Sequence, residues 1–230
     1  MRTESADPAP RAALFDVDGT LVDTNYLHVV AWWEAFRQAG HPVPMADVHR
    51  AVGMGADRLP GHLLGDEGER LVGEQVRQAH SVLYATYFPT LTPLPGAAGL
   101  LRAVADAGWR VVLASSASGA ELAAMRAALD VDEVIHDAAS GDDVDVTKPA
   151  PDLVRQAVRL AGVAPERAVF VGDTVWDMRA CGDAGVPAVG VLSGGVPRAD
   201  LEAAGAVRVY AGPAELLDRL DTSPLARPRS

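Results

Sequence analysis

The chain has 230 residues, enough for one large domain or for a domain that carries an insertion. Its hydrophobic content of 49%, with 22 Gly and 16 Pro, is typical of a globular α/β protein and argues against a mainly disordered chain. A net charge of −11 disfavours nucleic acid and anionic membranes as partners, because both are bound by basic surfaces.

The ends and the cysteine content point to a reducing compartment. Residues 1–10 contain no apolar signal-peptide core, and no apolar run approaches the about 20 residues of a membrane span. The single cysteine, Cys181, excludes an intramolecular disulfide and is interpreted as a small buried residue. We therefore expect a cytoplasmic protein that does not act at a membrane, with residues 1–10 and 223–230 as flexible ends.

The first predicted elements are a strand and a helical block. Residues 12–15 form a short apolar run, which predicts a buried strand that delivers Asp16 at its carboxyl end. Residues 24–88 then carry apolar side chains at helical spacing, interrupted by a loop rich in glycine and proline. No strand is predicted inside this block.

From residue 89 onward, helices and strands alternate. Repeated strand–helix units predict a parallel sheet with helices on both faces, joined by right-handed crossovers. We expect an α/β fold: a doubly wound, Rossmann-like core over 11–23 and 89–222, with a small all-helical domain over 24–88 inserted after the first strand. The further strands are predicted at 111–114, 133–135, 168–171 and 188–192, and the helices at 100–107, 120–129, 151–161 and 178–184.

Two pairs of carboxylates follow predicted strands. Asp16 and Asp18 lie after the first strand, and Asp173 and Asp177 lie after the strand at 168–171. Each pair alone could consist of solvated turn aspartates, but the carboxyl ends of parallel strands share one edge of the sheet, where ligands bind. Four acids gathered there would repel one another, and oxygen ligands of this kind attract Mg²⁺. Ser115 follows the strand at 111–114 and should reach the same edge.

Lys148 is the only lysine of the chain. Arginine does not imitate its compact charge, so a position that stays lysine while every other cation is arginine indicates a chemical role. The sequence around it excludes a P-loop, which needs Gly-Lys-Ser/Thr. A pyridoxal Schiff base on Lys148 would leave the aspartates without a function. An EF-hand at Asp16 also fails, because its glycine and glutamate positions hold Leu21 and Leu27.

Taken together, these motifs resemble the phosphatases of the haloacid dehalogenase superfamily over nearly all of residues 12–220. The first motif of that family, Asp-x-Asp-Gly-Thr, corresponds to 16–20, and the second, a serine after an apolar strand, to Ser115 or its neighbour Ser116. The third corresponds to Lys148 in Lys-Pro-x-Pro-Asp, and the fourth to Gly-Asp-Thr-x-x-Asp at 172–177. The helical block resembles the cap domain of the family.

The resemblance implies a role for each motif residue. Asp16 would attack phosphorus to form an aspartyl-phosphate, and Asp18 would act as general acid and then as general base. Mg²⁺ would be held by Asp16, the Asp18 carbonyl and Asp173, with Asp177 aiding directly or through water. The phosphate would be bound by a larger set: Gly19, Thr20, Ser115, Ser116 and Lys148.

The same motifs discriminate between activities inside the family. Dehalogenases lack a carboxylate at the position of Asp18, and phosphonate-cleaving relatives use a cap lysine, which this chain does not have. The remaining alternative is a β-phosphoglucomutase-type isomerase, whose start of the cap resembles the segment around His28. Gly172, where such mutases carry an acid, argues against it. His28 fits either a hinge role or an ordinary helix residue.

The predicted activity is therefore hydrolysis of a small phosphorylated metabolite, of the phosphoglycolate or sugar-phosphate type. Arg58, on a cap loop, could bind a carboxylate or a second phosphate of the substrate, or could be a surface cation. A non-catalytic phosphate binder is the alternative from another class, but it would need no nucleophile at Asp16. We expect a monomer or a homodimer.

Overall fold

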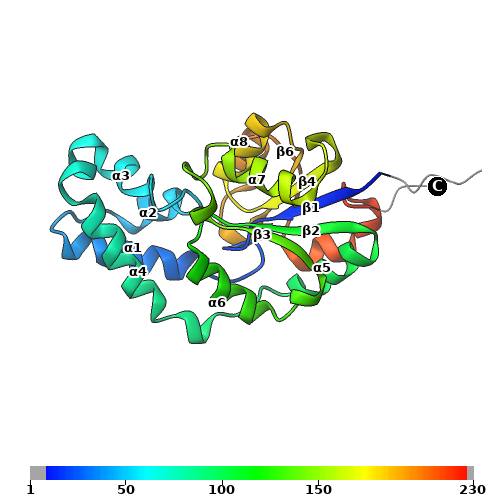
Figure 1. The fold of residues 1–230 in the computed structure, drawn as a ribbon. Coiled ribbons are helices and arrows are strands. Elements are labelled where there is room, and N and C mark those ends of the chain that lie inside the picture. Colours follow the sequence, from blue (N-terminus) through cyan, green and yellow to red (C-terminus); the bar gives the residue numbers. More distant parts are fainter. Residues whose placement is uncertain (1–8, 227–230) are drawn as a thin grey trace, which may run out of the picture.

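The computed structural model describes residues 9–226 and has two lobes, a sheet with helices on both sides and a smaller lobe made of helices (Figure 1). The sheet has six strands, all of its pairs are parallel, and its order is β3-β2-β1-β4-β5-β6. The first strand lies at the centre, so the segments that follow β1, β2 and β4 leave the sheet side by side. The strands are β1 (Arg11–Phe15), β2 (Trp109–Ala114), β3 (Ile135–Ala139), β4 (Ala168–Gly172), β5 (Ala188–Val191) and β6 (Ala206–Tyr210).

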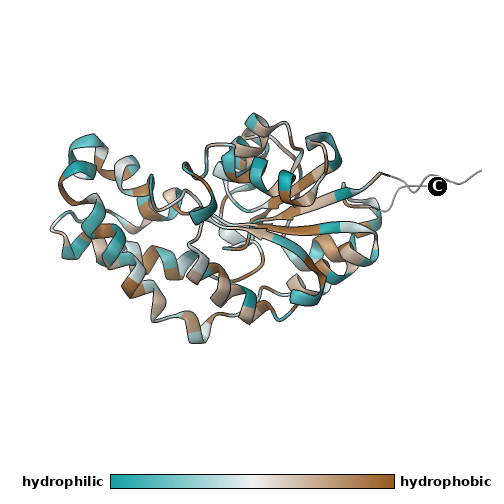
Figure 2. Ribbon diagram, in the orientation of Figure 1, coloured by the Kyte–Doolittle hydropathy of each residue, from teal (hydrophilic) through white to brown (hydrophobic). Residues whose placement is uncertain are grey.

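Alternate residues of the strands face two separate hydrophobic clusters. In β1, Ala13 and Phe15 belong to one cluster, and Ala12 and Leu14 to the other. The inner strands are buried on both faces, which explains why they are almost continuously apolar (Figure 2). Helices α5 (Ala97–Asp106), α6 (Gly119–Leu129) and α10 (Pro213–Asp218) cover the first face, and α7 (Asp152–Ala161), α8 (Val175–Ala184) and α9 (Arg198–Ala203) cover the second.

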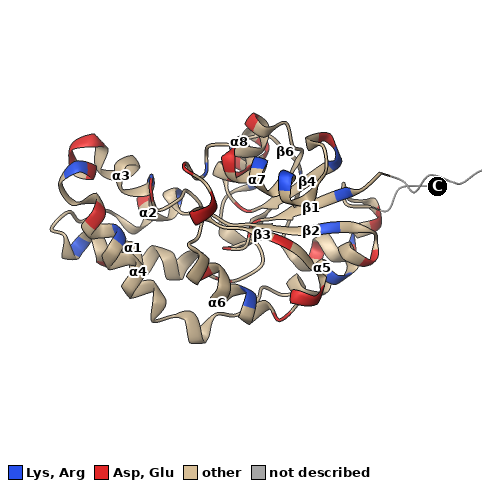
Figure 3. Cartoon of the chain, in the orientation of Figure 1, with Lys and Arg blue, Asp and Glu red and all other residues tan. Residues whose placement is uncertain are grey.

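The helical lobe has a hydrophobic cluster of its own. Trp32, Phe36 and Val76 are among its buried members, and they pack with one another rather than with the sheet. Acidic and basic residues lie close together on the outside of this lobe (Figure 3), where Glu34 pairs with Arg37. Its helices are α1 (Asn25–Gln38), α2 (Met45–Ala51), α3 (Leu59–Gly68) and α4 (Glu74–Ala85), with one π-helical turn (Glu69–Gly73) before α4.

The predicted doubly wound fold is confirmed, but two strands differ from expectation. The strand expected at 133–135 lies at Ile135–Ala139, because Asp132–Val134 forms a 3₁₀ turn. A short apolar run does not by itself separate a turn from a strand. The strand β6 was not predicted: it is at the edge of the sheet, and Val207 is 58% exposed there.

The C-terminal segment is packed further than expected. Ser223 is buried and Leu225 is fully buried in the cluster below the sheet, and Arg11 donates a hydrogen bond to the Ala226 carbonyl. The prediction of a flexible end from residue 223 is therefore wrong for 223–226, because Leu225, in an otherwise polar tail, is buried in the core. The predicted flexible segments at 1–8 and 227–230 lie outside the described residues.

Candidate active site

Three strand ends bring the predicted motifs to one edge of the sheet. Asp16 follows β1, Ser115 follows β2 and Asp173 follows β4. The pairing of β1 with β4 continues one residue beyond the strand, since the Asp16 N–H donates to the Val171 carbonyl at 2.9 Å. The backbone ladder thus positions Asp16, which is 3% exposed.

Lys148 is the buried cation of this edge, with 1% of its surface exposed. Its Nζ lies 2.7 Å from Asp16 Oδ1 and 2.8 Å from Asp177 Oδ1. Burial alone would lower the pKa of Lys148, but the two carboxylates raise it above the ordinary lysine value. The ammonium group therefore stays charged and links two acid-bearing segments that are far apart in sequence.

Asp177 is held by the first turn of α8. Thr174 caps this helix: its N–H and its hydroxyl donate to Asp177 Oδ2 at 3.0 and 2.6 Å, and the Asp177 N–H donates back to the Thr174 hydroxyl at 3.2 Å. The other carboxylate oxygen, Asp177 Oδ1, therefore faces Lys148. The capping box therefore orients the carboxylate before any ligand arrives.

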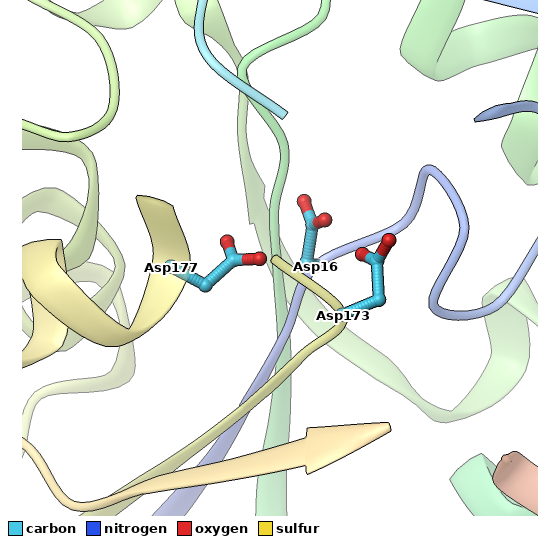
Figure 4. Close-up of side chains that lie close together, drawn as sticks. All are labelled: Asp16, Asp173 and Asp177. Atoms are coloured by element: carbon cyan, nitrogen blue, oxygen red, sulfur yellow. The ribbon is translucent and has the colours of Figure 1, made fainter. Parts of the chain in front are cut away.

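Three carboxylates, from Asp16, Asp173 and Asp177, share one buried space (Figure 4); oxygens from the three lie within 4.8 Å of one another. Asp173 accepts hydrogen bonds from the Thr20 hydroxyl at 2.9 Å and from the Asn25 amide at 2.8 Å. Even so, burial and the charge of Asp177 raise the pKa of Asp173 to about 7.

The same cause, burial, raises the pKa of Asp16 well above its ordinary value, although Lys148 opposes the shift. One lysine therefore does not balance three buried carboxylates. A second positive charge bound among their oxygens would complete the balance, and an all-oxygen donor set of this kind fits a hard divalent cation such as Mg²⁺.

Asp18 lies in a different environment, at the wall of a cavity over Asp16. Its Oδ1 accepts from the Thr24 hydroxyl at 2.7 Å and lies 3.0 Å from His28 Nε2, and its Oδ2 accepts from the Ser115 hydroxyl at 3.2 Å. Burial opposes ionisation of Asp18, but His28 and the two hydroxyls outweigh it and lower the pKa. Asp16 and Asp18 are thus shifted in opposite directions, as expected for carboxyls with different tasks.

His28 belongs to a stacked group of rings in the helical lobe. Its Nδ1 lies 3.1 Å from His80 Nε2, and its ring stacks on Tyr84 with centroids 3.8 Å apart. The ring of His80 stacks on Trp32 at the same separation. Asp18 raises the pKa of His28 against the effect of burial, whereas burial, followed by the charge of His28, lowers the pKa of His80 well below its ordinary value.

The two serines after β2 differ in their surroundings. The Ser115 hydroxyl is engaged, since it donates to Asp18 and accepts from the Ala117 N–H at 3.1 Å. Ser116 lines the cavity, and its buried hydroxyl has no hydrogen-bond partner among the described residues. Ser116, which entered as the one-residue alternative, therefore has the hydroxyl that is free to meet a ligand.

Gly19 and Thr20, which the resemblance assigns to phosphate binding, make hydrogen bonds inside the protein instead. The Gly19 N–H donates to the Val22 carbonyl at 2.8 Å and to the Thr24 hydroxyl at 3.2 Å, so it is already used inside its own loop. The Thr20 hydroxyl is used by Asp173. Gly19 is needed for space, because a Cβ there would lie 2.5 Å from an Asp173 oxygen.

The helical lobe is docked onto this edge by several contacts. Asp57 accepts hydrogen bonds from the Thr147 hydroxyl and, at 3.5 Å, from its N–H. The Gly55 N–H donates to the Lys148 carbonyl at 3.4 Å, and a Cβ at Gly55 would clash with Thr147. On the other side, the Trp176 indole donates to the Arg50 carbonyl at 3.2 Å.

Arg58, the cap residue predicted to meet the substrate, is not part of the cavity. It is exposed and lines outer grooves with Pro149 and Arg179. Its neighbour Asp57 turns toward Thr147 instead. The interpretation of Arg58 as a surface cation fits this position.

The sequence motifs do not point to three residues that the structure places at or beside the site: Asn25, His80 and Tyr84. Asn25 and His28 occupy the first turn of α1, and His80 and Tyr84 are four residues apart on α4, so each pair shares a helix face. This spacing is the only signal in the sequence, and it does not indicate which surface a face meets.

None of the helices within residues 9–226 is long and apolar enough to cross a bilayer. The buried Cys181 is confirmed as a core residue, and burial raises the pKa of its thiol.

Comparison with known proteins identifies the family. A phosphoglycolate phosphatase of Rhodospirillum rubrum is 30% identical over 92% of this chain and 91% of its own length. An N-acetylmuramic acid 6-phosphate phosphatase of Pseudomonas aeruginosa is 32% identical over 92% of this chain and 95% of its own. The crystal structure of a hydrolase from Pseudomonas syringae, 33% identical, superposes with a TM-score of 0.85 over 92% of this chain and 98% of that one. The sequence model of the haloacid dehalogenase-like hydrolases matches residues 10–185, and the chain belongs to this family.

Proposed function

We propose that this protein is a Mg²⁺-dependent phosphomonoesterase that hydrolyses a small phosphorylated metabolite through an aspartyl-phosphate on Asp16. The observation that carries the proposal is the arrangement of a buried Asp16, paired with Lys148, beside an Asp18 that is held by His28. The two relatives named above are both called phosphatases, of phosphoglycolate and of N-acetylmuramic acid 6-phosphate, which supports the reaction class but not one substrate.

Asp16 would act as the nucleophile. A carboxylate oxygen of Asp16 attacks phosphorus, and the bond between phosphorus and the ester oxygen breaks as the acyl phosphate forms. Lys148 fixes the carboxylate at 2.7 Å and places a positive charge where phosphoryl oxygens gather. The Ser116 hydroxyl, free inside the cavity, would donate to one of those oxygens.

Asp18 would handle the protons. The departing alkoxide takes a proton from Asp18, and in the second half Asp18 accepts a proton from the water that attacks the acyl phosphate and releases inorganic phosphate. The lowered pKa of Asp18 and the raised pKa of His28 favour a proton on His28 Nε2, which lies 3.0 Å from Asp18 Oδ1. His28 would return it to Asp18 for protonation of the leaving group.

Asp16, Asp173 and Asp177, with the Asp18 carbonyl, would hold the Mg²⁺. When bound, the cation would supply positive charge beside the nucleophile and the phosphate, which lowers their mutual repulsion. The helical lobe over residues 24–88 would serve as the cap that encloses the substrate. It would contribute His28 and the upper wall of the cavity.

The phosphosugar mutase remains the alternative activity, and Gly172 favours the phosphatase. A Cβ at Gly172 would lie 2.6 Å from the Asp177 carboxyl carbon, so an acid at this position would displace a residue that touches Lys148. Phosphosugar turnover without net phosphate release would establish the mutase.

The proposed function is tested by phosphate release. The purified protein with Mg²⁺ should hydrolyse members of a phosphorylated-metabolite panel, and Asp16→Asn should lower kcat by at least about 10⁴-fold, because it removes the nucleophile. Asp221→Asn, on an exposed residue of the last turn, is the control and should keep full activity. Wild-type protein that released no phosphate from any member, under conditions in which a known phosphatase does, would refute the proposal.

A further inference from the structure

The cavity over Asp16 and Asp18 lies between the sheet edge and the helical lobe and has a volume of about 50 Å³. The helical lobe provides a mainly apolar wall, which includes Trp32, Val52 and Leu59. Of the described residues that line it, none is arginine or lysine. Apart from the position of the transferred phosphate, a leaving group in this space therefore contacts mainly apolar surface and no lysine or arginine side chain.

The two histidines at the cavity do not replace a cation. His80 is 4% exposed, packs against Trp32, and has its pKa lowered well below the ordinary value by burial. It is therefore neutral near pH 7. His28 is paired with Asp18 at 3.0 Å, so any positive charge on it is already matched. Neither ring offers an unpaired charge to a second anion of the substrate.

A groove that adjoins the cavity is acidic. This groove shares His80, Ser116 and Glu121 with the cavity and is also lined by Asp57, Glu74 and Asp142. Its one basic residue, Arg77, is bound by Glu69 at 2.6 Å and by Glu74 at 3.3 Å. Arg58 faces other grooves.

Glu121 brings this negative character into the cavity itself. It is 9% exposed, and its Oε2 accepts hydrogen bonds from the Ser118 N–H at 2.8 Å and hydroxyl at 3.0 Å, which anchors the side chain at the start of α6. Among the hydrogen bonds of the described residues, none involves Oε1. Its charge reaches across the cavity, since it contributes, after Asp18, to the raised pKa of His28.

We propose, building on the phosphatase activity proposed above, that the leaving group of the substrate is compact and has no second anionic group, and that a hydroxyl or ammonium group of it donates to Glu121. A carboxylate or a second phosphate in this space would be taken out of water beside Glu121 with no cation to pair with, which is strongly unfavourable. Phosphoglycolate and sugar bisphosphates are therefore poor substrates, although relatives of this chain are named for phosphoglycolate. A mutase that passes through a bisphosphate is disfavoured for the same reason.

The test uses phosphomonoesters in matched pairs that differ by one anionic group, with Mg²⁺ present. The pairs are phosphoglycolate with 2-hydroxyethyl phosphate, 3-phosphoglycerate with glycerol 3-phosphate, and fructose 1,6-bisphosphate with fructose 6-phosphate; ethanolamine phosphate adds a cationic member. In each hydrolysed pair, kcat/KM should favour the member without the second anion by at least about 10²-fold. Equal or higher kcat/KM for the anionic members would overturn the inference.

A charge-removing variant tests the role of Glu121 directly. Glu121→Gln keeps an oxygen that can accept the hydrogen bonds of Ser118 but removes the charge. The preference for the member without the second anion should therefore fall by about tenfold in each pair. Glu166→Gln, on an exposed residue far from the cavity, should leave the preference unchanged. An unchanged ratio in Glu121→Gln protein with a wild-type melting temperature would contradict the role of Glu121.

The two proposals fail in different ways. Absence of phosphate release from every ester would refute the phosphatase activity itself, and this inference with it. Phosphate release with a higher kcat/KM for the members that carry a second anion would refute only the proposed substrate class.

Discussion

The sheet edge and the helical lobe contribute to the same site in opposite ways. At the edge, Asp16, Asp173 and Lys148 are ionisable groups with 3% exposure or less. Lys148 lies 2.7 Å from Asp16, and Asp173 accepts hydrogen bonds from the side chains of Thr20 and Asn25. In the helical lobe, the residues over the cavity are aromatic, aliphatic or paired, and His80 is a neutral imidazole buried among rings. The edge gathers buried ionisable groups, whereas the lobe adds a mainly apolar wall and one histidine, His28, that is paired with Asp18.

We therefore expect the sheet edge to carry the reaction and the helical lobe to contribute to substrate selectivity. On the proposed function, the edge would bind the phosphate that every phosphomonoester shares, whereas the lobe and Glu121 would face the part of the substrate that varies. Changes at the edge should therefore affect stability and all substrates alike, and changes in the lobe should affect the rate or the choice of substrate.

The largest effect should come from removing the buried cation. Lys148→Met leaves Asp16 and Asp177 buried without their partner, so the free energy of unfolding should fall by about 3–5 kcal/mol. The loss should be larger at pH 8 than at pH 5, because the carboxylates can become neutral by binding protons at the lower pH. Chemical denaturation at the two pH values measures this, with Arg159→Met, on an exposed helix face, as the control. Equal loss at both pH values would show that packing, not charge, is what Lys148 supplies.

Divalent cations should stabilise the edge in a pH-dependent way. The folded-state pKa of Asp173, about 7, is above its ordinary value of 3.8. Without metal, the folded state binds this proton more tightly than the unfolded state, so this group makes the free energy of unfolding fall as pH rises from about 4 to about 7. Mg²⁺ binds the ionised form, so it should raise the melting temperature more at pH 8 than at pH 5.5, equivalent to about 2.7 kcal/mol at 100 times its Kd.

Thermal unfolding in EDTA and in excess Mg²⁺ checks this expectation. The variant Asp173→Asn should lose the part of the pH slope that Asp173 contributes and most of the Mg²⁺ stabilisation. A Mg²⁺ effect of the same size in that variant would place the cation elsewhere.

In the helical lobe, removal of His28 should affect turnover rather than stability of the edge. His28→Ala frees Asp18 from one of its hydrogen-bonding partners and removes the stored proton, so kcat should fall by about 10²-fold while KM changes little. His136→Ala, on an exposed strand residue, is the matched control. Steady-state kinetics give kcat and KM for both variants. A rise in KM at unchanged kcat would assign His28 to substrate binding instead.

The smallest effect should come from the contact between the lobes. Asp57→Ala removes the acceptor for the Thr147 hydroxyl and N–H, a loss of about 0.5–1.5 kcal/mol in docking of the helical lobe, seen as a severalfold increase in KM. Asp66→Ala, exposed on the same lobe, should have no effect. Unaltered KM in Asp57→Ala protein would mean that this contact does not hold the lobe closed.

The sequence predicted the centre of the sheet better than it predicted the edge of the sheet and the C-terminal segment. Strand ends at Asp16, Ser115 and Asp173 could be predicted because each lies directly after an apolar run, and parallel pairing brings such ends together. The edge strand β6 and the packing of Leu225 could not, since their apolar residues are few and their burial depends on distant partners. From its loop alone, Arg58 could be either a substrate contact or a surface cation, and the structure places it at outer grooves, away from the cavity.

What the sequence by itself determined is the charged half of the site: which carboxylates follow which strands, and one lysine that nothing else could replace. Local backbone geometry is enough for that, because those groups lie within a few residues of a strand or helix end. Only the tertiary structure decided the other half: that His80 lies against His28 from 52 residues away, that Ser116 rather than Ser115 has a hydroxyl without a partner among the described residues, and that Glu121 lines the cavity over Asp16. Those relations depend on how the helical lobe docks on the sheet, which no spacing in the chain encodes.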